Sequence, residues 1–138
     1  MQALRFDPGA FASGDMIIVS RVDLGADTSI VREGMESAAD VSVSVGRVIK
    51  RGIGAVNVKV KVTTENEHSR SYLELIDEIK SASMPEKVEK DALAVFSLMA
   101  DAESKVHGQD LENIHFHEVG QNDAIADVVG ACTAIHEL

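Results

Sequence analysis

The chain has 138 residues, of which 45% are hydrophobic and only 4% aromatic, so it is long enough for one domain with an aliphatic core. Its 13 Lys and Arg residues against 23 Asp and Glu give a formal net charge of −10, which argues against nucleic-acid binding. The single cysteine, Cys132, excludes an intrachain disulfide framework and a thiolate cluster. Neither a leader-like apolar run nor a stretch of transmembrane length occurs, so we expect a cytoplasmic protein.

The first elements are predicted from turn and capping residues. The short, partly apolar stretch near 2–7 ends at a Pro-Gly pair, which predicts a strand. Ser13 can act as the N-cap of a helix that carries Asp15 in its first turn and stops at Gly25. A second helix is expected from 28 or 29 to about 38.

Strict alternation then replaces the helical spacing. VSVSV and VNVKVKV predict an antiparallel hairpin over about 41–63 with one buried face and with Lys59 and Lys61 outward. The remaining expected elements are helices over 71–83 and from Pro85 to about Val106, a short strand near 113–117, and a last helix over 123–137. The sequence therefore predicts an α+β fold, a single two-layer domain with about five helices.

Two histidines stand close together in the sequence IHFHEVG. If residues 114–118 are extended, the period of two places His115 and His117 on one face and Phe116 and Glu118 on the other. Two imidazoles on the same face can turn toward one metal ion, whereas on a helix they would point about 200° apart. The pattern indicates a metal site, although such pairs also occur on strand surfaces that bind no ligand.

The helix after this motif carries carboxylates at helical spacing, and Asn122 is expected to cap it. Asp123 and Asp127, at i and i+4, are expected on one side together with Gly130 and Ala134, whose small size would let another backbone or a ligand approach closely. The apolar stripe on the opposite side consists of Ile125, Val128, Val129, Cys132 and Ile135. The two aspartates and the glutamate of the motif are therefore candidate metal ligands beside the histidine pair, although an aspartate at a helix start needs no ligand.

The segment HFHEVGQNDAIADVVGA resembles the signature of the LarC-type nickel insertion proteins, whose members read close to HFHEVGxxDxIxDIVGA. The opening RFDPGAFASGDM is similar to the start of the same family, and RGIGAVNVKV and AESKVHG also fit its patterns. Two positions depart from it: Phe11 stands where a glycine is usual, and TTENEHSR keeps only His68 of a usual histidine-rich run. The resemblance implies that residues 1–138 correspond to the N-terminal part of a longer protein.

The resemblance also implies a role in cofactor biosynthesis. Members of the family complete the nickel-pincer cofactor of lactate racemase by inserting nickel into pyridinium-3,5-bisthiocarboxylic acid mononucleotide, a lyase-type chelatase reaction that consumes CTP. Imidazole suits divalent nickel, and carboxylates are weaker ligands that would permit its release. The sequence has no Gly-rich strand-to-helix loop with a following Lys, so we expect this chain to be inactive alone and to need the missing C-terminal region or its separate chain.

The loop between Asp7 and Asp15 is a second candidate region. Ser13 and Gly14 open a helix whose free N–H groups suit a phosphate, which would be that of the mononucleotide. Asp15 would compete with this anion unless a cation bridges them. Asp7 and Asp15 are therefore predicted as catalytic, site-lining carboxylates close to the histidine pair; the alternative is that these residues only cap the helix.

Two other classes of function stay open at this point. A metallohydrolase could use the histidine pair, but Val119 and Gly120 stand where the HxHxDH motif of such enzymes requires Asp and His. A non-catalytic oligomerisation or binding module, for which a homo-oligomer would be natural, would use its acidic residues only for capping and solvation.

Overall fold

The computed structural model describes residues 3–10, 12–64, 69–117 and 120–137. The elements in these ranges are α1 (Gly14–Asp23), α2 (Thr28–Ala38), β1 (Val41–Lys50), β2 (Ile53–Val62), β3 (Arg70–Ser71), α3 (Tyr72–Ser81), α4 (Glu86–His107), the 3-10 helix η1 (Leu111–Asn113), β4 (His115–Phe116) and α5 (Asn122–His136). The predicted α+β class, with its five α-helices and its antiparallel hairpin, is confirmed for this part of the chain.

The hairpin of β1 and β2 pairs in one continuous register, from Val41 opposite Val62 to Lys50 opposite Ile53. Arg51 and Gly52 form the turn with φ angles of 52° and 79°, as a two-residue hairpin loop requires. Val41 and Val43 of β1 are buried, and α1, α2 and α5 pack against the hairpin. The hairpin and these helices therefore form two layers, with Lys59 and Lys61 exposed as predicted.

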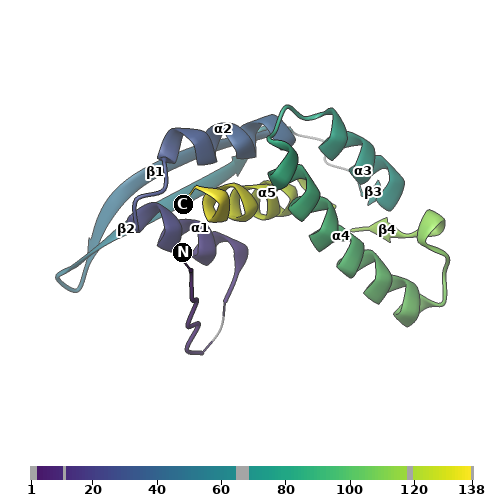
Figure 1. Ribbon diagram of the computed structural model, residues 1–138, viewed down its shortest axis with the longest axis horizontal. Coiled ribbons are helices and arrows are strands. Elements are labelled where there is room, and N and C mark those ends of the chain that lie inside the picture. Colours follow the sequence, from purple (N-terminus) through teal and green to yellow (C-terminus); the bar gives the residue numbers. More distant parts are fainter. Residues whose placement is uncertain (1–2, 11, 65–68, 118–119, 138) are drawn as a thin grey trace.

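The hairpin also differs in net charge from the rest of the chain. Residues 41–62 contain five Lys and Arg and no Asp or Glu, so this segment carries +5 and the remainder −15, which together give −10. Ile49 and Ile53 beside the turn are 79% and 71% exposed. Figure 1 shows the hairpin turn projecting at the end of the molecule opposite β4. The largest group of basic residues in a short segment is therefore remote from the histidine pair.

Helix α5 lies at the centre of the molecule (Figure 1), in contact with α1, α2 and α4 and with both strands of the hairpin. Ile125, Val129 and Cys132 pack in one hydrophobic cluster, with residues of α3 and α4. Ala126 and Ala134 belong to a second cluster, with residues of α1, α2 and the hairpin. The predicted apolar stripe is confirmed, and the side that carries Gly130 and Ala134 is buried as well.

Gly130 and Ala134 show which of the two expected neighbours, another backbone or a ligand, approaches this side of α5. A Cβ atom added at Gly130 would lie 2.7 Å from Sδ of Met35 and 2.8 Å from Cδ1 of Ile18, so two core side chains already fill the space. Ala134 is fully buried, and its carbonyl accepts a hydrogen bond of 2.9 Å from Nε of Arg21 in α1. The small residues of α5 admit neighbouring helices rather than a ligand.

Two predicted strands differ from the structure. Residues 3–7 form no strand, because the two sheets of the described chain pair β1 with β2 and β3 with β4 and leave no partner for this segment. The strand expected near 113–117 is shortened to His115–Phe116, because the 3-10 helix already occupies Leu111–Asn113. Its pairing with β3 is antiparallel, with Arg70 opposite Phe116.

Arg70 and Asn122 form a buried polar network next to β4. The Arg70 guanidinium donates to the carboxylate of Glu78 (2.6 Å), to the carbonyl of Gly120 (2.6 Å) and to Oδ1 of Asn122 (2.9 Å). Asn122 also accepts from the backbone N–H of Asp40 and donates to a threonine hydroxyl. The expected capping role of Asn122 is therefore wrong: Gln121 is the N-cap of α5, and the Asn122 side chain holds the start of α5 against distant segments.

We expect Arg70→Met to lower the free energy of unfolding by about 3 kcal/mol, because it leaves the Gly120 carbonyl and the network around Asn122 without their charged donor. Urea denaturation of both proteins measures the difference. Arg47→Met is the matched control, since its ion pair with Asp23 is exposed and long, at 3.5 Å, and should contribute less than about 1 kcal/mol. Equal losses in the two variants would contradict the role of the network.

Candidate metal centre

The alternation predicted for the motif IHFHEVG is present in the described residues. Ile114 and Phe116 are buried, whereas His115 and His117 are exposed. Phe116 packs edge-on against Tyr72, with ring centroids 6.1 Å apart, and a Cβ added at Gly120 would lie 2.8 Å from the Phe116 carbonyl oxygen. The buried side chains hold this short strand against the body, so both imidazoles face solvent.

A cavity of about 440 Å³ lies beside the two imidazoles. Its lining includes His115 and His117 and, from the last turns of α4, Glu103 and His107. Nε2 of His107 lies 3.0 Å from the Glu103 carboxylate. Neither residue is among the ligands predicted from the sequence. Helix α4 ends at His107, and the chain after Gly108 brings β4 back to the same surface. Residue spacing along the sequence does not predict that the end of α4 lies beside β4.

The predicted aspartates gather at a different place, where the start of α1 meets α5. A Cβ added at Gly14 would lie 3.2 Å from Cβ of Asp127, so the two helices approach closely there. Burial, together with the carboxylates of Asp15 and Asp123, raises the pKa of Asp127 from 3.8 to about 6. Three carboxylates predicted on separate grounds therefore interact electrostatically, and a cation between them would relieve their repulsion.

The residues predicted to hold the nucleotide lie at the same end of α1. Ser13 is the N-cap residue, but its hydroxyl donates to the Asp15 carboxylate, and its oxygen accepts no capping hydrogen bond from a backbone N–H. Asp7 lines a separate cavity of about 540 Å³, together with apolar residues of α1 such as Ile17. The structure therefore brings Ser13, Gly14 and Asp15 to Asp127 and leaves Asp7 on another surface.

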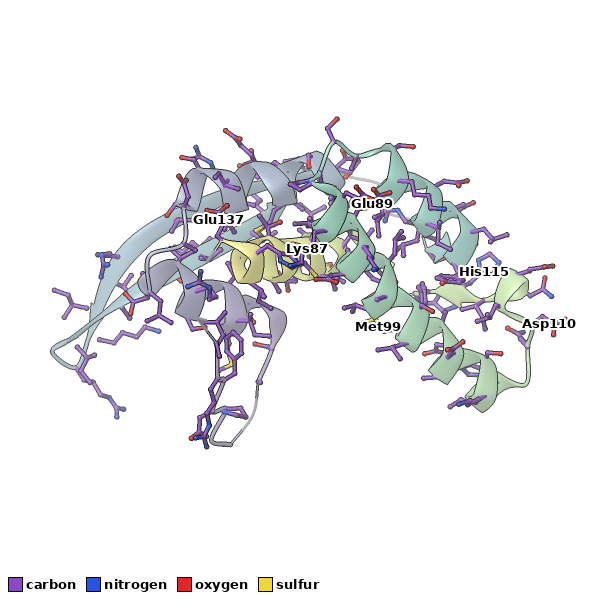
Figure 2. The ribbon with its side chains drawn as sticks, viewed as in Figure 1. Lys87, Glu89, Met99, Asp110, His115 and Glu137 are labelled. Carbon is purple, nitrogen blue, oxygen red and sulfur yellow. The ribbon has the colours of Figure 1, made fainter. Side chains whose placement is uncertain are left out.

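Within the described residues, the histidine pair lies apart from the candidates of the N-terminal loop. Figure 2 shows His115 beside α4, well away from the N-terminal loop that holds Asp7. Among residues 3–10, 12–64, 69–117 and 120–137, no three His, Cys, Asp or Glu side chains already converge as a metal site. Glu118, the remaining predicted ligand, lies outside the described residues, as do Phe11, His68 and Val119. The roles of all these residues stay predictions.

Two further titratable side chains, Cys132 and His136, lie in the second half of α5. Burial, and then the carboxylate of Asp91, raises the pKa of the Cys132 thiol to about 11, so it stays protonated and is a poor ligand at neutral pH. Nε2 of His136 lies 2.5 Å from the carboxylate of the same aspartate, so this imidazole already has a partner. In the described part of the chain, no helix is long and apolar enough to cross a membrane.

An exposed imidazole pair on an α+β scaffold defines a candidate metal-binding protein, and comparisons with known proteins specify the class. The family profile described as nickel insertion protein matches residues 4–138. The chain belongs to the nickel insertion protein family. No solved structure matches it.

Several relatives align with all or nearly all of this chain. A Methanococcoides burtonii protein named "Putative nickel insertion protein" is 51% identical over 138 residues, which are 100% of this chain and 35% of the relative. A protein of the same name from Methanosarcina barkeri is 50% identical over 139 residues, again 100% of this chain and 35% of the relative. In Staphylococcus saprophyticus, the "Pyridinium-3,5-bisthiocarboxylic acid mononucleotide nickel insertion protein" is 34% identical over 137 residues, 98% of this chain and 35% of the relative. The chain thus spans about a third of the length of these relatives.

The raised pKa of Asp127 predicts a pH-dependent cost in metal-free protein. Because the folded state binds this proton more tightly than the unfolded state, stability is lost as pH rises from about 4 to about 6 and the loss is complete above that. The free energy of unfolding of Asp127→Asn should therefore exceed that of the wild type by about 1 kcal/mol at pH 7.5 after solvent screening, so the variant should unfold at a higher temperature. At pH 3.5 it should show no advantage.

Thermal denaturation at both pH values tests this prediction, with Asp101→Asn, an exposed carboxylate of α4, as the control. An equal effect of both substitutions at pH 7.5 would show that Asp127 does not carry the repulsion.

Proposed function

We propose that this chain binds Ni²⁺ through His115 and His117 and delivers it for insertion into pyridinium-3,5-bisthiocarboxylic acid mononucleotide, as the nickel-handling part of a CTP-dependent nickel insertion protein. Nickel is here the cargo of the reaction rather than a resident cofactor. The proposal places this chain in the formation of the nickel-pincer cofactor of lactate racemase.

The observation that carries the proposal is the position of the two imidazoles. His115 lies in β4 and His117 directly after it, and both are exposed and line one cavity, in a chain whose family is that of nickel insertion proteins. Neutral imidazole is a good ligand for divalent nickel. The name of the Staphylococcus saprophyticus relative supports the mononucleotide as the acceptor of the metal.

The remaining predicted residues have supporting roles in this proposal. Asp123, Asp127 and Glu118 are candidate oxygen ligands that hold nickel more weakly than imidazole and so permit its transfer. Asp7 and Asp15 are proposed to line the site of transfer, with Ser13 and Gly14 binding the phosphate at the start of α1. Since the histidine pair and α1 are separated within one chain, the transfer would need either the rest of the longer protein or a second copy.

Calorimetric titration with Ni²⁺ tests the histidine pair directly. The wild type should bind nickel, and the double variant His115→Ala/His117→Ala should lose at least about tenfold in affinity, because both imidazole ligands are gone. Binding to the wild type should also weaken at acid pH, since protons compete with nickel for the ring nitrogens. Both side chains are exposed, so the variant should keep the wild-type unfolding temperature.

Equal nickel affinity in the two proteins would contradict the proposal and favour a non-catalytic binding module. The double variant Lys59→Ala/Lys61→Ala on the exposed face of the hairpin is a control for a non-specific change of the surface.

We further expect this chain alone to turn over no CTP. Five of its 13 basic residues lie on the hairpin, away from the candidate metal centre, and the remainder of the chain carries −15, which opposes the binding of a triphosphate there. The assay mixes the chain with Ni²⁺, CTP and the bisthiocarboxylate mononucleotide and measures CTP hydrolysis and activation of lactate racemase. CTP turnover by this chain alone would show that it holds the nucleotide site.

A further inference from the structure

The end of α4 brings a third imidazole to the cavity beside β4. His107 is the last residue of α4, and Gly108 ends the helix in the left-handed conformation, with φ 63°. His107 and Glu103, one turn earlier, line the same cavity as His115 and His117. The segment AESKVHG, which contains both residues, has no role in the function proposed above.

We propose that His107 is a third ligand of the nickel held by His115 and His117, and that Glu103 is the positioning residue that orients its ring. This inference rests on the proposed function of the histidine pair. The donor set it describes is three imidazoles from two separate elements, with the remaining coordination positions left to water or to the acceptor of the metal.

The pairing of His107 with Glu103 supports this role. The Glu103 carboxylate lies 3.0 Å from Nε2 of His107, so it can hold a proton on that nitrogen and leave Nδ1 as the nitrogen that binds the metal. Histidine ligands in metal sites commonly donate their other ring N–H to a carboxylate, which fixes the tautomer and raises the basicity of the ligand.

The exposure of the pair permits the movement that coordination requires. The His107 and Glu103 side chains are 60% and 41% exposed, and in their present positions no three His, Cys, Asp or Glu side chains of the described residues could hold a metal ion together. Rotation of exposed side chains between staggered rotamers is fast and costs little, so His107 can turn toward β4 when the metal arrives. We therefore expect His107 to move into the coordination sphere when the metal binds, rather than to be positioned there beforehand.

The experiment compares the wild type with His107→Ala, Glu103→Gln and the double variant His115→Ala/His117→Ala. Each protein is titrated with Ni²⁺, and nickel K-edge X-ray absorption counts its coordinated imidazoles. His107→Ala should lower nickel affinity at least about tenfold and reduce the imidazole count from three to two. Glu103→Gln should lower affinity by a smaller factor and keep the count at three. His136→Gln is the matched control, because this histidine also pairs with a carboxylate but lies at the far end of α5.

The outcomes separate this inference from the proposed function. If His107→Ala keeps the wild-type affinity and imidazole count while the double variant loses nickel, the third ligand is overturned and the histidine pair stands. If the double variant also binds nickel as the wild type does, the proposed function itself falls. A loss of affinity in His107→Ala with an unchanged imidazole count would show a structural role and equally overturn the inference.

Discussion

The burial of α5 on both of its long sides constrains the rest of the structure. One side must pack against α3 and α4 and the other against α1, α2 and the hairpin, so the helix uses larger aliphatic residues on the first and small ones on the second. Gly130 is the extreme case, since a methyl group there would enter the space of Met35 and Ile18. Arg21 satisfies carbonyl groups at the end of α5, which cannot all reach water. A helix held in this way gives the segment before it a fixed end.

Because that end is fixed, a strand of only two residues can present the histidine motif. A pair as short as β3 and β4 has too few backbone hydrogen bonds to be stable alone. Phe116 is buried on one side of it, and the Arg70 guanidinium ties the carbonyl of Gly120 and the side chain of Asn122 to the neighbouring strand. The two exposed histidines are thus carried by a segment whose buried residues and flanking loop are both fixed. Stability and the proposed function depend here on the same few contacts.

Local patterns were sufficient for most of the fold. The alternation of valines predicted the hairpin, and helical spacing with capping residues predicted all five helices to within a few residues. The exposed positions of His115 and His117 followed from the period of a strand alone. Each of these features depends on neighbours in the sequence, where the physical rules are strong.

The features that failed depend on contacts between distant segments. Residues 3–7 have the composition of a strand but no partner edge in the described sheets, and strand propensity alone cannot supply one. Asn122 stands at a typical capping position, yet Arg70, 52 residues away, uses its side chain. The same holds for the candidate site: the approach of His107 to β4 depends on how the chain after Gly108 returns, which no spacing encodes.

The loose geometry of the candidate centre fits the proposed delivery of nickel, in which the metal would have to be released. A site whose ligands already converge needs no ordering on binding, and it holds its ion tightly for that reason. Here the imidazoles are exposed and come from separate elements, so binding must fix several free side chains at an entropic cost that weakens the complex. Open positions on the ion would then accept the sulfur atoms of an acceptor, which are softer ligands than imidazole. The metal can pass to the acceptor by ligand exchange while the buried side of β4 stays in place.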